Sequence, residues 1–321
     1  MADASATGNQ VRLEEVPRKK IKWKDISKNW ELYIFVALPL IWLFIFMYYP
    51  MYGNVIAFKR FNPNRGILGS PWVGLANFQR FFNSYKFAQI MWNTFIINIY
   101  EVLAAFPIPI ALALLIHYCP FPRYKKVVQM VTYAPHFISV VVMVGIIFKL
   151  LGPRIGLVNT ILREIGIGEI DFLGRAGRFR HVFVWTGIWQ RTGWGTIIYL
   201  AALSGVDPEL HESAKVDGAN IWRRMWHIDI PGIGPTVIIL LILRLGRMLF
   251  VGFEKIFLMQ NNLNISTSEV IQTYVYKIGL AAANPNFSYA AAIGLFNNVI
   301  SFVLLILVNR VARKLTETSL W

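Results

Sequence analysis

Apolar segments long enough to cross a lipid bilayer limit the fold of this chain more than any other feature. About 30 Å of hydrocarbon requires about 20 residues of helix, and lipid offers no partner to an unpaired backbone N–H or C=O. The segments that reach this length are 32–55, 93–117, 127–150, 181–204, 234–259 and 288–311. We therefore predict an all-α integral membrane protein with six transmembrane helices.

The composition agrees with a bilayer as the main solvent. Of the 321 residues, 56% are hydrophobic and 15% are charged, and the mean hydropathy is +0.49. The net charge of +15 is carried mainly outside the apolar segments. This pattern indicates basic residues that orient the spans and meet anionic headgroups, and it argues against a nucleic-acid-binding protein. The single cysteine, Cys119, excludes an internal disulfide framework.

The chain is expected to divide into a cytoplasmic tail with an interfacial segment (1–31), a transmembrane domain (32–311) and a second cytoplasmic tail (312–321). The first ten residues are small and polar, without the apolar core of a cleaved signal peptide. Short basic loops fall on the same side as the basic N-terminal segment, which predicts that both termini are cytoplasmic. The basic residues of these loops are Arg123, Lys125, Lys126, Lys215, Arg223, Arg224, Arg310, Arg313 and Lys314.

A polar stretch at 207–231 interrupts the apolar segments and is expected to form a helix-turn-helix elbow. Asp207 is a favourable N-cap for a first short helix. Gly218 can adopt the positive φ that ends this helix. A second helix is expected over 219–227, and Pro231 is expected to stop it. From the residues alone, an ordinary amphipathic loop between two spans is the alternative.

The elbow resembles the EAA loop of permease subunits of binding-protein-dependent ABC importers, which reads E-A-A-x-x-D-G-A and later I-x-x-P. The residues that carry the resemblance are Glu212, Ser213, Ala214, Asp217, Gly218, Ala219, Met225 and Pro231. Ser213 replaces the first alanine, and Met225 stands where phenylalanine is common. The resemblance implies a type I ABC importer permease fold in which the elbow is a coupling element: it docks into a cleft on a cytoplasmic ATPase and transmits its motion.

Further segments resemble the branch of this family that takes up polysaccharides and oligosaccharides. They are YYPMYG, VGFEKIFLMQN and the terminal TSLW. The resemblance implies a bacterial inner-membrane subunit that pairs with a second, similar permease and with two ATP-binding subunits. It also implies an extracytoplasmic solute-binding protein that delivers an oligosaccharide, with alginate importers among the members of the branch.

The chain is not expected to be an enzyme or to hold a cofactor or metal of its own. The phosphate-binding motif G-x-x-x-x-G-K-[ST] is absent, so ATP and Mg²⁺ are expected on the partner ATPase. The string that begins at His211 has Lys215 at its fifth position, which removes the second ligand of a zinc protease site. An ion-coupled secondary transporter of a polar solute also places charges in its spans and stays open as the alternative.

Charged and aromatic residues inside the spans are the candidates for a substrate pathway, because a charge in hydrocarbon is costly unless it faces a cavity or a partner. The charges of the predicted 234–259 helix are expected to share one stripe. Aromatic rings beside hydrogen-bond donors suit sugars, whose C–H faces stack while their hydroxyls need partners. The candidates are Trp189, Arg191, Trp194, His136, Arg244, Arg247, Glu254 and Asn297.

Structural roles remain the alternative for these residues. The arginines can pair with Glu254 or with the partner subunit, Lys255 can reach the membrane interface, and Trp194 can belong to an interfacial aromatic belt. Asn297 can bond to another helix, and Glu101, which lies near two prolines, can satisfy freed backbone groups or touch substrate.

An acidic oligosaccharide such as a uronate is the expected substrate if Arg191 and Arg247 face the pathway. Guanidinium groups bind carboxylates through two parallel hydrogen bonds. The loops after the first and third predicted spans are cationic and would add long-range attraction for such a substrate.

Overall fold

The chain splits into two compact units, Met1–Gly53 and Asn54–Trp321, and the computed structural model describes residues 30–316 of them. Within that range the regular elements are all helices, and the β contacts are two isolated bridges. The prediction of an all-α protein is confirmed. The N-terminal interfacial segment and the terminal TSLW lie outside the described residues.

The first unit contains one long helical segment. It consists of α2 (Trp30–Leu43), a π-helical turn (Phe44–Tyr48) and α3 (Tyr49–Met51). The helical segment continues to Phe58 and is then 29 residues long. Its most apolar part has a mean hydropathy of 2.1, and no residue of that part is buried within the protein. A helix that is apolar all round is stable in lipid and not in water. This agrees with the predicted span at 32–55.

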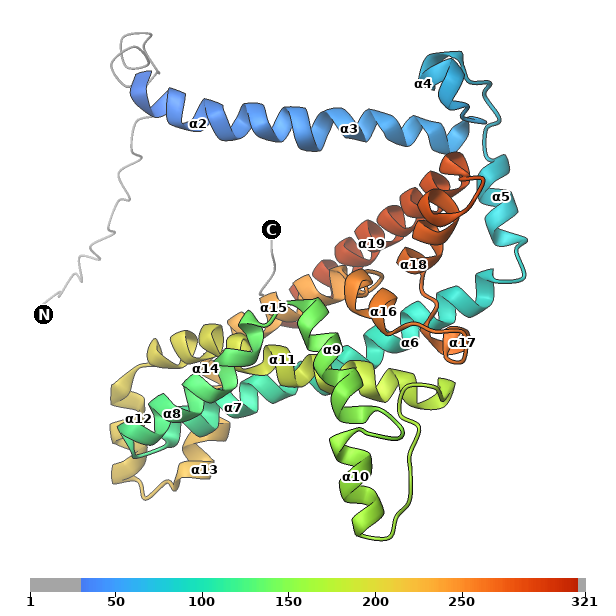
Figure 1. Cartoon of the computed structure of the whole chain (residues 1–321). Coiled ribbons are helices and arrows are strands. Elements are labelled where there is room, and N and C mark those ends of the chain that lie inside the picture. The colour runs from blue at the N-terminus through green and yellow to red at the C-terminus, as the bar shows by residue number, and fades with distance from the viewer. Residues whose placement is uncertain (1–29, 317–321) are drawn as a thin grey trace, which may run out of the picture. The chain divides into compact units, whose positions relative to one another are not determined.

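The second unit is built on two sets of packed helices (Figure 1). α6 (Phe87–Ala105) and α7 (Pro107–Tyr118) form one candidate span of 32 residues. α11 (Ala176–Ser204) packs along both of them, and α19 (Phe287–Thr316) packs against α15 (Gly234–Gly246). The remaining elements outside the elbow and the broken spans are η2 (Tyr52–Phe58), η3 (Pro63–Arg65), α4 (Gly66–Gly69), α5 (Ala76–Phe82), α10 (Leu157–Glu164), α17 (Ile265–Ser268), α18 (Ile271–Tyr276) and η6 (Lys277–Ala281).

Buried apolar side chains fill the contacts among these helices. One cluster, which includes Ile97 and Phe183, joins α6 to α11, and a second, around Phe81 and Ile293, joins α5 to α19. Within a membrane, close van der Waals packing of such side chains is a main source of helix association. The helices around the substrate-pathway candidates are therefore held at defined positions.

The predicted span at 127–150 is not one straight helix. It consists of α8 (Pro122–Tyr133), a 3-10 turn (Ala134–Phe137) and α9 (Val140–Leu151). The two helical parts are bent by 104°. Pro135 removes a backbone donor at the break, and the side chain of Ser139 accepts a hydrogen bond from the Val142 N–H as the cap of a new helix.

The prediction of one continuous helix at 234–259 is also wrong. α15 ends at Gly246, residues 247–252 are not helical, and α16 (Phe253–Met259) begins anew. The break falls between two glycines, which have low helix propensity. Gln272 donates to the carbonyl of Leu249, which the broken helix leaves without an internal partner.

The number of spans is not settled by helix length and composition. Among residues 30–316, three helices are long and apolar enough to cross a membrane, or five if each bent pair is one span. α11, with 29 residues, contains Gln190, Arg191 and several Gly residues, which lower its hydropathy. The count of six therefore stays a prediction.

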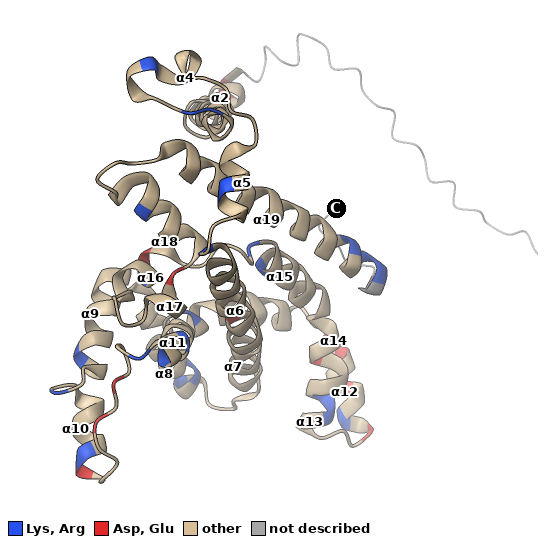
Figure 2. Cartoon of the chain, turned by 90° about the vertical axis from the view of Figure 1, so that its right-hand side faces the viewer, with Lys and Arg blue, Asp and Glu red and all other residues tan. Residues whose placement is uncertain are grey.

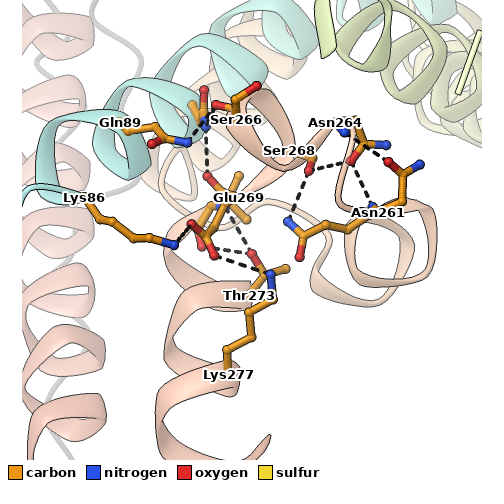
Figure 3. Close-up of polar contacts among 12 residues, drawn as sticks. Lys86, Gln89, Asn261, Asn264, Ser266, Ser268, Glu269, Thr273 and Lys277 are labelled. Carbon is orange, nitrogen blue, oxygen red and sulfur yellow. Dashed lines mark hydrogen bonds and ion pairs between the residues drawn. The ribbon is translucent and has the colours of Figure 1, made fainter. Parts of the chain in front are cut away.

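A polar network joins the segment between α16 and α18 to the start of α6 (Figure 3). The side chain of Glu269 is 2% exposed, and its carboxylate lies 2.8 Å from Lys86 Nζ and 3.3 Å from Lys277 Nζ. Asn93 donates to the backbone carbonyls of Ser266 and Glu269. Burial alone would lower the pKa of Lys86, but the hydrogen bond to Glu269 and its negative charge raise that pKa above the usual value. The network holds α17 and α18 against α6.

Candidate functional site

A cavity of about 580 Å³ lies between α6, α7, α11 and α15 of the second unit. Its walls are mostly apolar, and its charged lining residues are Glu101, Arg191, Arg244 and Arg247. Apolar walls with a few convergent polar groups are typical of sites that bind small molecules. We therefore take this cavity as the first part of the candidate site.

Glu101 of α6 is the centre of the charged group. Nη2 of Arg191 donates to its Oε1, while Nη2 of Arg244 donates to its backbone carbonyl at 3.2 Å and lies 3.9 Å from Oε1. The Glu101 side chain is 12% exposed, compared with 55% for that of Arg191. Arg191 and Arg244 thus have a carboxylate partner within the chain, and it is Glu101 and not Glu254.

Arg247 lies at the end of α15 and lines the same cavity, but no carboxylate of the described residues pairs with it. Because α15 stops at Gly246 and Glu254 belongs to α16, the predicted stripe of three charges along one helix is wrong. Instead, the helix ends in a turn, and the Arg247 guanidinium lines the cavity wall without an ion-pair partner among the described residues.

Lys255 lies behind the wall formed by α11 and is buried within the protein. It is 7% exposed, and its ammonium donates to the Phe183 carbonyl at 3.0 Å and to Thr186 Oγ1 at 2.9 Å. The alternative in which Lys255 extends outward beside Glu254 is therefore wrong.

An aromatic pair forms another part of the cavity wall. The rings of His136 and Trp194 stack at a centroid distance of 4.5 Å and an interplanar angle of 4°, and Phe137 meets Trp194 edge-on at 5.6 Å. The break at Pro135 brings His136 to this position, since a continuous helix through 127–150 would direct it differently. Flat, stacked rings beside guanidinium groups can bind a sugar ring through its C–H face.

The structure thus brings together five of the predicted pathway residues, namely His136, Arg191, Trp194, Arg244 and Arg247. The other three do not line the cavity. Trp189 is 52% exposed on a different face of α11, Glu254 begins α16, and Asn297 is buried at 3% exposure within α19.

Glu101 is the functional candidate that the sequence reasoning did not select. It is the only acidic residue of the apolar segment 93–117, and a lone carboxylate in a span is expensive unless it has a partner or faces a cavity. That signal was present in the sequence. The nearby prolines suggest that Glu101 bonds to freed backbone groups. Its partners in the structure are instead arginine side chains of α11 and α15.

The elbow has the expected helix-turn-helix geometry. α12 (Pro208–Val216) starts at Asp207, whose side chain accepts a hydrogen bond from the Glu209 N–H at 2.9 Å. Gly218 has φ of +75° and reverses the chain. α13 (Ile221–Arg224) follows, capped by the side chain of Asn220.

The second helix does not stop before Pro231, which corrects the predicted end. A π-helical turn, η5 (Met225–Asp229), follows α13 and leads into α14 (Ile230–Gly232). The wider π-turn accommodates an irregular hydrogen-bond ladder, so the missing N–H of Pro231 does not end the helix. The chain then enters α15 with a bend of 58°.

The tip of the elbow presents an open and mixed surface, with acidic and basic side chains on α12 and α13 (Figure 2). Val216 is 88% and Trp222 65% exposed, and a Cβ added at Gly218 would meet no atom within 4 Å. Of the residues that match the family pattern, Glu212, Ser213, Asp217, Gly218 and Pro231 are exposed, and Ala214, Ala219 and Met225 are half-buried. Exposed large apolar side chains beside charges are typical of protein contact surfaces.

Known proteins similar to this chain are transport permeases. The Bacillus subtilis (strain 168) polygalacturonan/rhamnogalacturonan transport system permease protein YteP is 40% identical over 321 residues, covering 100% of this chain and 99% of its own. Protein LplB of the same organism is 39% identical and covers 96% of this chain. An arabinooligosaccharides transport system permease protein, AraP, is 27% identical.

A solved structure agrees with these relatives. The crystal structure of a bacterial ABC transporter involved in the import of the acidic polysaccharide alginate contains a chain that matches with a TM-score of 0.85 and 39% identity, over 92% of this chain and 99% of its own. Residues 92–317 match the family described as binding-protein-dependent transport system inner membrane component. The chain, with its elbow and its charged cavity, therefore belongs to this family of inner membrane transport components.

Proposed function

We propose that this chain is a permease subunit of an ATP-driven importer that takes up acidic oligosaccharides by alternating access. The observation that carries the proposal is the cavity, where three guanidinium groups and the stacked His136–Trp194 pair accompany a single carboxylate. The membership in a family of binding-protein-dependent transport components supports this reading over an ion-coupled secondary transporter.

The cavity supplies both kinds of contact that an acidic sugar needs. The stacked rings offer a face for the apolar side of a pyranose, and Arg247 offers an unpaired guanidinium for a carboxylate. Each charge-assisted contact contributes about 1.5–3 kcal/mol in a partly dry site. Glu101 competes with the substrate for Arg191 and Arg244, so that a polyanion is bound without being held too tightly to leave.

The substrates of similar proteins support an acidic substrate for this chain. Alginate is named as an acidic polysaccharide for one of them, and polygalacturonan/rhamnogalacturonan for another. A second structure of the alginate transporter is described as a complex with a periplasmic protein that carries an alginate pentasaccharide. We infer that the present chain likewise receives its oligosaccharide from an extracytoplasmic solute-binding protein.

The rest of the assembly follows from the same family membership. The chain pairs with a second, similar permease, and two cytoplasmic subunits bind ATP and Mg²⁺ and carry out hydrolysis, so that the permease itself is non-catalytic. The elbow at 207–231 docks into the ATPase, for which its exposed tip at Gly218 supplies a close-approach surface. Both termini lie in the cytoplasm, and the spans cross a bacterial inner membrane.

The test uses the assembled complex with its binding protein, reconstituted in vesicles. ATP hydrolysis and uptake are measured with uronate and neutral oligosaccharides of equal length. We expect uronates to stimulate both activities more strongly. Equal stimulation by both kinds of sugar would contradict the proposal of an acidic substrate. Uptake that persists without ATP and follows an ion gradient would contradict the proposal of an ATP-driven importer.

Replacing the unpaired guanidinium gives the sharper prediction. Arg247→Gln should raise the half-saturating uronate concentration about tenfold, which corresponds to the loss of one charge-assisted hydrogen bond, and should change the response to neutral sugars little. Arg313→Gln, at an exposed arginine in the last turn of α19 and away from both the cavity and the cationic outer loops, is the matched control. An unchanged response of Arg247→Gln to uronates would contradict a substrate contact at this residue.

A further inference from the structure

Asp229 is a buried carboxylate at the point where the elbow meets the end of α7. It closes the π-helical turn η5 and is 0% exposed. Tyr118, the last residue of α7, donates its hydroxyl hydrogen bond to Asp229 Oδ2. From the other side, Nε2 of His211 on α12 lies 3.1 Å from Oδ1. Three elements far apart in the sequence thus meet at one carboxylate.

One oxygen of the Asp229 carboxylate, Oδ1, lacks a hydrogen-bond donor among the described residues. The guanidinium of Arg224 lies over the Tyr118 ring at 5.8 Å and does not pair with the carboxylate. Nε2 of His211 is in ion-pair contact with Oδ1, but Oδ1 accepts no hydrogen bond from the described residues. A buried carboxylate is costly, and buried polar atoms in native proteins are nearly always satisfied. Packing alone therefore does not explain an acid at this position.

The Tyr118–Asp229 hydrogen bond is linked to the cavity through two helical segments. The elbow runs through α14 directly into α15, and α15 carries Arg244, which contacts Glu101 of α6. α6 and α7 form one candidate span, and its far end at Tyr118 returns to Asp229. The span and α15 are thus joined at two places, by Tyr118–Asp229 at the elbow and by Glu101–Arg244 at the cavity.

We propose that Asp229 is a positioning residue that couples the elbow to the α6–α7 span, so that a movement of α12 reaches Glu101 and its two arginines. The elbow is connected along the chain to α11, which carries Arg191, and to α15, which carries Arg244, but not to α6, which carries Glu101. When Asp229 is bound to Tyr118, a movement of the elbow displaces α7 as well as α15. Glu101, Arg191 and Arg244 then move together. This inference rests on the proposed function, since it assigns a route to the motion that an ATPase would impose on the elbow.

The test compares Asp229→Asn and Tyr118→Phe in the reconstituted complex with its binding protein. Tyr118→Phe removes the donor of the hydrogen bond, and Asp229→Asn keeps the size of the side chain but replaces the charged acceptor by a neutral, weaker one. We expect normal assembly and continued ATP hydrolysis, with a fall of about tenfold in oligosaccharide taken up per ATP hydrolysed. The double variant should be no worse than the more severe single variant, because both substitutions act on the same hydrogen bond.

Tyr124→Phe is the matched control, because Tyr124 on α8 is 62% exposed, and it should keep the wild-type uptake per ATP. Wild-type uptake per ATP in Asp229→Asn and Tyr118→Phe would overturn the inference alone. Reduced assembly and reduced ATP hydrolysis with an unchanged uptake per ATP would assign Asp229 a purely structural role and would also overturn the inference. A wild-type complex that hydrolyses ATP without importing any oligosaccharide would overturn the proposed function together with this inference.

Discussion

At the scale of single residues, Glu101 decides the charge that a substrate meets in the cavity. Its carboxylate is the only negative group of the lining, and it contacts two of the three lining arginines. Removing one partner of a buried ion pair leaves the other charges uncompensated. In this cavity the uncompensated groups would be guanidiniums, which are the groups that bind carboxylates best.

We expect Glu101→Gln to bind uronate oligosaccharides more tightly and to release them more slowly. In the assembled complex, the half-saturating uronate concentration and the maximal uptake rate should both fall, by about tenfold if one additional charge-assisted contact forms. Steady-state uptake over a range of substrate concentrations measures both quantities.

Glu254→Gln is the control for this variant, because Glu254 is a carboxylate of the neighbouring segment that does not line the cavity. Its kinetics should match those of the wild type. Weaker uronate binding in Glu101→Gln would show that Glu101 orders the arginines for the substrate and does not compete with it.

At the scale of elements, the interruptions of helices place the functional groups. The break between α8 and α9 presents His136, and the end of α15 presents Arg247. In the elbow, the positive φ of Gly218 and the cap at Asp207 define a short rigid helix whose tip remains open. Irregular backbone in a membrane protein is tolerated where it lines a cavity or contacts protein, and these positions fit that rule.

We expect Gly218→Trp to abolish association with the ATPase while the spans still insert. The new side chain would occupy the open space in front of the elbow, where the partner is proposed to dock. Co-purification of the ATPase and substrate-stimulated ATP hydrolysis are the measurements.

Gly166→Trp provides a matched control for the strain of a side chain at positive φ. Gly166 has φ of +79°, close to the +75° of Gly218, and it also has no atom within 4 Å of an added Cβ. It lies in the loop after α10, away from the elbow. If both variants assemble and hydrolyse ATP like the wild type, the elbow does not contact the ATPase.

At the scale of the whole molecule, the distribution of charge is the main evidence on orientation. Basic residues occur on α12 and α13 and in the last turns of α19, including Arg313 and Lys314 (Figure 2). Cytoplasmic loops of membrane proteins are enriched in Lys and Arg. The elbow and the end of α19 should therefore face the cytoplasm together.

A topology reporter tests this orientation. A fusion after Trp321 should be active only on the cytoplasmic side, and fusions in the loops around Gly66 and Gly166 only on the outer side. A fusion after Trp321 that is active outside the cytoplasm would contradict the count of six spans or their direction.

The elbow shows how much local sequence can predict. The positions of Asp207 and Gly218 were sufficient to predict a helix that starts at one and ends before the other, and both features are present. Caps and positive-φ turns depend on neighbouring residues only, so they can be read without knowing the fold. The continuation past Pro231 was not predictable in this way, because it depends on the π-helical turn that precedes it.

The sequence by itself determined the helical class, the apolar segments and the residue types of the site, since hydrophobic length and local propensity are properties of consecutive residues. Only the tertiary structure decided which of those residues meet. Glu101, Arg191 and Arg244 belong to three helices, and their contact depends on how α6, α11 and α15 pack. Helical periodicity places Arg244, Arg247 and Glu254 on one stripe only if a single helix continues through 234–259. In the folded chain Gly246 packs against Leu305 of α19, and the carbonyl of Leu249 accepts a hydrogen bond from Gln272. The helix ends between these contacts, at Gly246.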